Sequence, residues 1–290
     1  MTQISCLIPL YRSQPFFDNI CENIDAHLVE DAEILISDRH GLDDTATRLA
    51  ARYAGETRVR IMSVLDNDDW VGNICALIIA STGKYFRIIP HDDKASRAST
   101  MDLVRALEEN ADAVLAYGIV HAIDLQGAPL PKLNQLNATE SPTSKTWELE
   151  DALSLFWSNR FLGAFKGVVR ADIVRSLPLL IRKTPTLIWS ERAWLFALAL
   201  AGRFQFVPES ILIKRYYKGS ASSRWDCTPE VLADAVNVMT QYCDVLITDP
   251  ILRERAKLSL ATNGDARIQA MNTGRAHSAY RSLDDLLTQD

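Results

Sequence analysis

Residues 85–93, Tyr85-Phe86-Arg87-Ile88-Ile89-Pro90-His91-Asp92-Asp93, form a short apolar run that ends abruptly in two adjacent carboxylates. The isoleucine and aromatic residues predict a buried strand, and polar groups at the carboxyl end of such a strand lie where α/β sheets bind ligands. Adjacent carboxylates repel each other, which favours a bound cation or a hydrogen-bonding ligand. An acidic helix cap, with Asp93 preceding a helix from Lys94, explains the pair equally well. The stretch alone leaves both interpretations open.

Apolar runs and amphipathic segments alternate through the first 120 residues. Further strands are expected at 4–10, 33–37, 58–65 and 113–117, and helices at 16–28, 43–53, 70–81 and 99–109. This order implies a mostly parallel central sheet flanked by helices. The fold class expected is therefore α/β, of a nucleotide-binding type.

The pattern changes beyond residue 120. Residues 127–144 are rich in Pro, Asn, Ser and Thr and predict an exposed loop. Helices are expected at 147–157, 171–177 and 190–200, followed by a strand pair at 204–217. From 228 to the end the sequence predicts helices, broken near Pro250 and at Asn263-Gly264.

Composition excludes several classes of protein. The net charge of -6 gives no basic footprint, so no nucleic-acid partner is expected. The five cysteines are scattered without a C-x-x-C pair, which argues against zinc or a disulfide framework. There is no dinucleotide-binding glycine motif, no P-loop and no nucleophile elbow. With no signal-peptide pattern and no apolar stretch of about 18 residues, a cytoplasmic location is expected.

Motifs along the chain resemble those of family 2 glycosyltransferases, inverting enzymes with the GT-A fold. In the first half the matching stretches are ISCLIPLYR at 4–12, EILISDRHGLDDT at 33–45, NDDWVGN at 67–73 and GKYF at 83–86. In the second half they are FLGAFKGVVRAD at 161–172, SERAWLFALALAGRF at 190–204, VPE at 207–209 and RYYKGSAS at 215–222. Each motif is weak alone, but their order and spacing over residues 4–224 make the set fairly specific.

The resemblance implies a GT-A-like fold with a C-terminal helical extension. It implies a donor-binding half at 1–120, an acceptor-binding half of the same domain at 121–225, and a C-terminal helical region at 226–290. The implied partners are a nucleoside-diphosphate sugar, with a UDP-sugar favoured, and a glycan or glycan-lipid acceptor. The implied process is polysaccharide biosynthesis. Peripheral association with the inner face of the membrane and a homodimer are left open.

The resemblance also implies roles for individual residues. Asp38 falls on the carboxylate that accepts a hydrogen bond from the nucleobase, and Glu191 falls on the general base. Asp92 is the first choice as ligand of Mn²⁺ or Mg²⁺ and Asp93 the second, because hard cations prefer carboxylate oxygens. The other residues expected around the donor are Pro9, Tyr11, Trp70, Asn73, Arg215 and Lys218.

Several of these residue types have ordinary structural explanations. Tyr11 and Trp70 can simply pack against the sheet, and a charge such as Glu191 is favoured at any helix start. Arg215 and Lys218 can form a solvated strand end as readily as a phosphate site.

The chain also departs from the family pattern. Pro90 stands in place of the first acid of the D-x-D motif, and Tyr217 in place of a late histidine that often ligates the metal. Weaker metal binding, or metal-independent stabilisation of the diphosphate by Arg215 and Lys218, is therefore an alternative. Two further alternatives are a catalytically degenerate nucleotide- or glycan-binding protein and, less favoured, a sugar nucleotidyltransferase.

Overall fold

The chain divides into two compact units in a computed structural model. The first comprises residues 1–121, 163–176 and 204–214, and the second comprises 122–162, 177–203 and 215–290. The structure describes residues 3–38, 41–63, 69–131, 133, 148–158, 163–176, 178–220, 225 and 228–273. The expected division into donor, acceptor and C-terminal helical parts is functional and stays a prediction.

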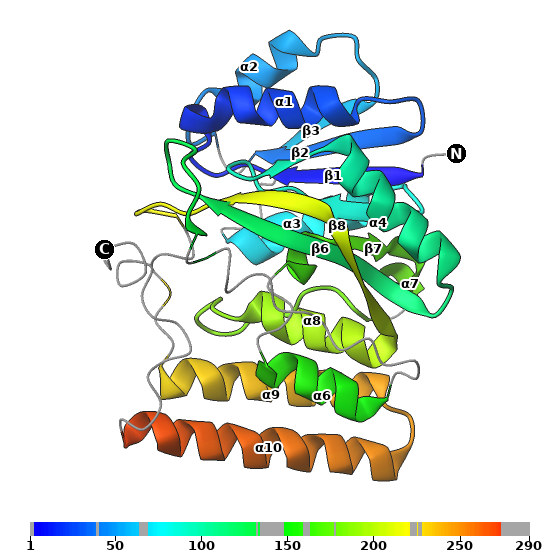
Figure 1. Ribbon diagram of the computed structural model, residues 1–290, viewed down its shortest axis with the longest axis vertical. Helices are drawn as coiled ribbons and strands as arrows, with labels where there is room; N and C mark the ends of the chain where they lie inside the picture. The colour runs from blue at the N-terminus through cyan, green and yellow to red at the C-terminus, as the bar shows by residue number, and fades with distance from the viewer. Residues whose placement is uncertain are drawn as a thin grey trace. The chain divides into compact units, whose positions relative to one another are not determined.

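Four parallel strands form one half of the sheet in the first unit. They are β1 (Ile4–Pro9), β2 (Ala32–Asp38), β3 (Val59–Ser63) and β4 (Tyr85–Ile88), in the spatial order β3-β2-β1-β4. The connecting helices are α1 (Phe17–His27), α2 (Thr45–Arg52) and α3 (Trp70–Ala80). Because parallel crossovers are right-handed, α1 and α2 cover one face and α3 covers the other (Figure 1). The α/β prediction is confirmed.

The strand order reverses between β1 and β4. From β1 the chain adds β2 and then β3 on one side, and it later adds β4 on the other side of β1. Among the parallel strands described, this is the one place where the order reverses. The two strands pair in register from Ile4 opposite Tyr85 to Leu7 opposite Ile88. In open α/β sheets, ligands bind at the carboxyl ends of strands that flank such a reversal. The fold therefore directs attention to the loops that follow β1 and β4.

Antiparallel strands complete the eight-stranded sheet in the order β4-β7-β6-β8-β5. These strands are β7 (Val168–Arg170), β6 (Ala113–Ile123), β8 (Arg203–Arg215) and the two-residue β5 (Lys94–Ala95). The remaining helices of this unit are α4 (Arg97–Glu109), α7 (Ala171–Ser176) and the short 3-10 helices η1 (Gln14–Phe16) and η2 (Ala164–Lys166). The strand pair expected at 204–217 was wrong, because β8 is one continuous strand. The helix-cap interpretation of Asp93 was also wrong: Ser96 caps α4, accepting a hydrogen bond from the Ser99 amide at 3.1 Å.

The second unit contains α6 (Leu149–Ser158), α8 (Ser190–Ala201), α9 (Pro229–Leu246) and α10 (Pro250–Asn272). Helix α9 packs against both α8 and α10, and α6 packs against α8 and α10. The break expected at Asn263-Gly264 was wrong. Gly264 is buried inside α10, where a Cβ atom would lie 3.1 Å from Val236 of α9, so the glycine allows close helix packing. Most of the loop expected at 127–144 lies outside the described residues.

No helix in the described ranges is both long enough and apolar enough to cross a bilayer.

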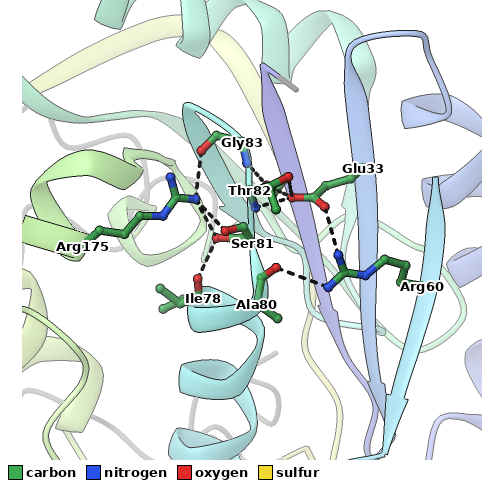
Figure 2. Close-up of polar contacts among 9 residues, drawn as sticks. Glu33, Arg60, Ile78, Ala80, Ser81, Thr82, Gly83 and Arg175 are labelled. Carbon is green, nitrogen blue, oxygen red and sulfur yellow. Dashed lines mark hydrogen bonds and ion pairs between the residues drawn. The ribbon is translucent and has the colours of Figure 1, made fainter. Parts of the chain in front are cut away.

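A buried carboxylate ties β1 and β2 together at their amino ends, opposite the edge where ligands bind. Glu33 lies opposite Ser5 in the ladder and accepts a hydrogen bond from the Ser5 hydroxyl at 2.6 Å. It also accepts a hydrogen bond from the Thr82 amide at 2.5 Å (Figure 2). Burial raises the pKa of Glu33, but these hydrogen bonds and Arg60 outweigh it, so the pKa lies below its ordinary value. Gly83 belongs to the same cluster, since a Cβ atom there would lie 2.7 Å from the Ser5 hydroxyl.

The turn between α3 and β4 is held on its other side by Arg175 of α7. Its guanidinium donates to the carbonyl oxygens of Ser81 at 2.7 Å and Gly83 at 3.1 Å (Figure 2). The Ser81 hydroxyl in turn donates to the Ile78 carbonyl at 2.7 Å, closing the last turn of α3. These contacts fix the start of β4, and hence the position of the residues at its far end.

Candidate functional site

The loops after β1 and β4 meet at the reversal of strand order. Pro9 ends β1, and its carbonyl oxygen lies 3.2 Å from Nδ1 of His91. The His91 ring also contacts Phe16, with 5.5 Å between ring centroids, so His91 joins the two loops. Tyr11 follows β1 with 37% of its surface exposed, next to Arg12 at a φ of +49°. An exposed aromatic ring on a strained turn at this edge can stack on a planar ligand.

Asp38 ends the neighbouring strand β2, where it lies opposite Ser63 of β3. Its side chain is half-buried, at the same carboxyl edge as Pro9. Asp43 plays a different role, because its carboxylate accepts hydrogen bonds from the amides of Thr45 at 2.9 Å and Gln14 at 3.1 Å. Asp43 therefore stabilises the entry to α2, and it also anchors the loop after β1.

Trp70 and Asn73 lie in the first turn of α3. Asp69 caps this helix, accepting a hydrogen bond from the Gly72 amide at 2.9 Å, as N-terminal acids commonly do. The Trp70 ring packs edge-on against Phe165 of η2, with 6.1 Å between centroids. The Asn73 side chain is 2% exposed, and its Oδ1 atom has no hydrogen-bond partner among the described residues. A buried unsatisfied amide oxygen is costly unless a ligand or water satisfies it.

Asp92 and Asp93 differ sharply in environment. Asp92 is half-buried, whereas Asp93 is 1% exposed and forms an ion pair with Lys166, which is itself only 12% exposed. Burial lowers the pKa of Lys166 well below its ordinary value; repulsion from Lys214 lowers it further, and attraction to Asp92 opposes both. The two carboxylates are therefore not an equivalent pair of cation ligands. Asp93 has an internal partner.

The turn that carries these carboxylates is tied to α1. Asn19 donates to the carbonyl oxygens of His91 at 3.0 Å and Asp93 at 2.8 Å. Asn23 donates to the same Asp93 carbonyl at 2.8 Å and accepts from the Ala95 amide at 3.0 Å. Side-chain amides thus satisfy the backbone groups of residues 91–95, which have few strand partners of their own. The turn is held rigidly beneath the candidate site.

A buried polar network continues from this turn to Lys166. Arg87, fully enclosed in β4, donates to the Lys166 carbonyl at 3.0 Å and to the Thr100 hydroxyl at 2.7 Å. Thr100 lies 2.7 Å from Nε2 of His27, whose Nδ1 lies 2.8 Å from the Asn23 carbonyl. Burial lowers the pKa of Arg87 to about 10 and that of His27 to about 4. Both ends of the Asp93–Lys166 pair are therefore held by one network.

Two glycines bring the segment with Lys166 close to β6. A Cβ atom at Gly167 would lie 2.3 Å from the Ala116 carbonyl oxygen, and one at Gly163 would lie 2.7 Å from the Gly118 carbonyl oxygen. Only glycine permits so close an approach of two backbones. These glycines, on either side of Lys166, therefore set how closely its segment approaches β6.

The two carboxylates expected to hold a divalent cation do not both fit that role. Pro90 brings no ligand, and Asp93 is engaged by the Lys166 ammonium group. Within the described part of the chain, no three His, Cys, Asp or Glu side chains gather closely enough to hold a metal ion. Mn²⁺ and Mg²⁺ are held chiefly by carboxylate oxygens, and here only Asp92 remains as a candidate ligand of the expected pair.

Glu191 lies in the second unit, in the first turn of α8 and half-buried. The turn before it is strained, because Leu187 and Trp189 have φ values of +63° and +65°. Thr184 holds this turn: its hydroxyl donates to the Ile188 carbonyl at 2.8 Å, and its amide donates to the Ser190 hydroxyl at 3.0 Å. Strained, over-determined turns are frequent at functional sites, which supports a specific role for Glu191.

Arg215 and Lys218 also belong to the second unit, whereas the parallel strands and their carboxyl edge belong to the first. The Arg215 guanidinium donates to the carbonyl oxygens of Asp124 at 3.2 Å and Leu125 at 3.0 Å. Lys218 is exposed on a turn that ends at Ser220. Arg215 has a structural contact that the sequence did not predict, and the phosphate role of both residues stays a prediction.

Comparison with known proteins places this geometry in a wider context. No family model matches the chain, and no curated protein sequence matches it. Among solved structures, S. aureus TarS 1-349 in complex with UDP-GlcNAc has a TM-score of 0.66 at 10% identity, over 99% of this chain and 80% of that one. The chain has a GT-A glycosyltransferase fold.

A second solved structure with this fold is the mannosyltransferase PcManGT from Pyrobaculum calidifontis, in complex with GDP-Man and Mn²⁺. It matches with a TM-score of 0.51 at 13% identity, over 99% of this chain and 83% of that one. These likenesses confirm the GT-A-like fold that the sequence motifs implied. At such identities they establish the fold alone, and the role of each residue rests on its own geometry.

Lys166 is the residue at this edge that sequence reasoning missed. It stands inside the motif at 161–172 but has no sequence signal linking it to Asp93, 73 residues away. The one available signal was the pair of glycines around it, which indicates close backbone contact. Asn23, which holds the Asp93 turn, was likewise hidden inside an amphipathic helix.

Proposed function

We propose that the chain is an inverting glycosyltransferase that moves a sugar from a nucleoside-diphosphate sugar to a hydroxyl group. The observation that carries the proposal is the GT-A fold over 99% of the chain, with Asp38 and Asp92 following parallel strands on either side of β1, at the reversal of strand order. This is the edge at which open α/β sheets bind nucleotides. The glycosyltransferases that share the fold carry UDP-GlcNAc or GDP-Man in their solved complexes.

On the donor side, Asp38 accepts a hydrogen bond from the nucleobase, and the ring of Tyr11 or Trp70 stacks on that base. A carboxylate at a strand end accepts hydrogen bonds from base N–H groups, and an exposed aromatic ring stacks on the base at little conformational cost. The unsatisfied Oδ1 atom of Asn73 is a further acceptor close to the start of α3. A UDP-sugar is the favoured donor, as the sequence motifs implied, and UDP-GlcNAc is bound in one of the glycosyltransferases that share the fold.

On the acceptor side, Glu191 is the proposed general base. The acceptor oxygen attacks the anomeric carbon while its proton passes to the Glu191 carboxylate, and the bond from that carbon to the diphosphate oxygen breaks. The nucleoside diphosphate leaves with the electron pair of the broken bond. A single displacement of this kind inverts the anomeric configuration.

The proposed acceptor is a glycan, free or linked to lipid or protein, as in the assembly of a polysaccharide. Reaction on the cytoplasmic side of a membrane, peripheral docking and a homodimer belong to the same proposal. The second unit is the natural place to seek the acceptor, because it contains Glu191 and the helices of the C-terminal region.

The proposal is tested by following UDP-, GDP-, CDP- and dTDP-sugars for cleavage by the wild-type chain and by Glu191→Gln. Loss of a general base lowers the rate by about 10²- to 10⁴-fold, whether the acceptor is a sugar or water. Glu230→Gln is the matched control, because Glu230 also lies in the first turn of a helix, α9, and we expect it to leave the rate unchanged.

The products separate the remaining classes. Release of nucleoside diphosphate is expected of a glycosyltransferase, whereas release of pyrophosphate would identify a nucleotidyltransferase. Rates equal to background in the wild type and in both variants would identify a binding protein without transferase activity and refute the proposal.

A further inference from the structure

Two lysines and two aspartates meet at the carboxyl edge of the sheet. Lys166 forms an ion pair with Asp93, and its charge is influenced by both Asp92 and Lys214. The β5–β8 ladder explains how Lys214 reaches this place. Lys94 pairs with Ile213 in antiparallel register, so the next residue of β8, Lys214, lies at the position opposite Asp93. All four residues belong to the first unit.

The charges of this cluster match those of a metal site. Two carboxylates carry two negative charges, which a divalent cation would balance. Here two lysines lie beside them, and the ion pair with Asp93 favours the charged form of Lys166 against its burial. A lysine acts on a phosphate as a point charge, and a half-buried setting screens that charge less than open solvent does. The four side chains thus carry the same total charge as two carboxylates with a bound divalent cation, although no cation is needed to reach it.

Structural stabilisation alone explains the buried pair poorly. Taking both charges of an ion pair out of water costs about as much as their attraction returns, so a buried pair adds little net stability compared with apolar residues. The Asp93–Lys166 pair is nevertheless held from both sides, by Asn19 and Asn23 on the carbonyl of Asp93 and by Arg87 on the carbonyl of Lys166. The network therefore fixes the backbone from which both charged side chains extend.

We infer that Lys166 and Lys214 replace the divalent cation at Asp92 and Asp93, so that the chain binds the diphosphate of its donor without a metal ion. The inference rests on the proposed function for the identity of the ligand. It goes beyond that function by assigning the positive charge that offsets the diphosphate to two side chains, neither of which the motif comparison had singled out.

The test is calorimetric titration of the full chain with UDP, GDP, CDP and dTDP, once with EDTA and once with Mn²⁺. For the wild type we expect one of these nucleotides to bind with the same Kd in both conditions. Lys166→Met and Lys214→Met are expected to weaken binding by about tenfold or more in EDTA, the effect of removing one ionic contact worth about 1.4 kcal/mol. Lys166→Arg, which keeps the charge, is expected to restore most of the affinity.

Lys94→Met is the matched control. Lys94 is adjacent to Asp93 in the chain, but its half-exposed ammonium group pairs with Glu22 on α1, and we expect no change in Kd. Lys214 is half-buried rather than enclosed, so Lys214→Met tests the inference even if Lys166→Met fails to fold.

Two results would overturn the inference in different ways. Binding by the wild type that requires Mn²⁺, or unchanged Kd values in both methionine variants, would refute the lysine assignment and leave the donor site intact. Absence of binding by all four nucleotides in both conditions would refute the donor site itself, and with it the proposed function.

Discussion

His27 is the buried histidine of the polar network beneath the candidate site. Its Nδ1 atom faces the Asn23 carbonyl, an acceptor, so the neutral ring donates there and leaves Nε2 to accept from Thr100. Burial, together with repulsion from Arg87 and Arg97, lowers the pKa of this ring to about 4. The folded chain therefore holds His27 neutral through a range of pH in which an unfolded histidine is charged.

This difference predicts an acid-side loss of stability. The pKa of His27 is lower in the folded chain than in the unfolded chain. The contribution of His27 to the free energy of unfolding is therefore complete above pH 6.5 and is lost as the pH falls toward 4. The free energy of unfolding should fall by about 1.4 kcal/mol per pH unit through that window on account of this group. Urea denaturation at several pH values measures it. The slope should flatten in His27→Gln but not in His121→Gln, the exposed control; equal slopes in all three proteins would contradict the prediction.

At this scale the sequence identified candidate groups but not their partners. Asp92 and Asp93 are adjacent in the chain and looked like one ligand pair, yet the fold gives Asp93 a buried lysine and leaves Asp92 half-buried. Nothing in a local pattern shows that a lysine 73 residues away will reach one carboxylate and not its neighbour. The contact depends on the approach of η2 to β6, which is a tertiary property.

The turn before α8 is the most strained element among those described. Leu187 and Trp189 both occupy the left-handed region, two of the three non-glycine residues in which a positive φ is found in the described chain. Thr184 and Ser190 hold the turn closed through side-chain hydrogen bonds. The strain aligns the start of the helix that carries Glu191.

The strain predicts an unusual order of stability. In Leu187→Ala and Leu187→Gly the side chain beyond Cβ is lost equally, but alanine retains the steric penalty of positive φ and glycine does not. We expect the glycine variant to be more stable by about 1 kcal/mol. Ala261→Gly on exposed α10 is the control, where the same change should cost about 1 kcal/mol. Chemical denaturation of the wild type and the three variants measures these differences in the free energy of unfolding. A Leu187→Gly variant less stable than Leu187→Ala would show that the turn is unstrained.

Elements with a clear period were predicted well, and elements shaped by their neighbours were not. The strands and helices through residue 109 agree with prediction to within a few residues, because apolar periodicity and capping residues are local. Strand β8 was expected to be a pair of strands, but it continues unbroken through Pro208, although proline is rarely found inside a strand. Helix α10 continues through Asn263-Gly264 because packing against α9 compensates for the poor helix propensity of glycine.

At the scale of the whole molecule, the alternation of strands and helices was enough to predict a parallel sheet. The antiparallel half was harder, because β7 is three residues long and β5 only two, and both form through pairing with distant strands. The reversal of strand order between β1 and β4 is likewise invisible locally. It nevertheless decides which strand ends converge, and hence which residues form the candidate site.

The central claim is that this edge of the sheet binds a sugar nucleotide. The most direct measurement is the thermal unfolding of the chain with UDP-, GDP-, CDP- and dTDP-sugars. At a ligand concentration about 100 times its Kd, binding stabilises a protein by about 2.7 kcal/mol, or roughly 5 °C in Tm for a chain of this size. We expect at least one of these donors to raise the Tm of the wild type and of Asp265→Asn, an exposed control, and to do so much less for Asp38→Asn. If no donor changes the Tm of the wild type, the donor site is refuted.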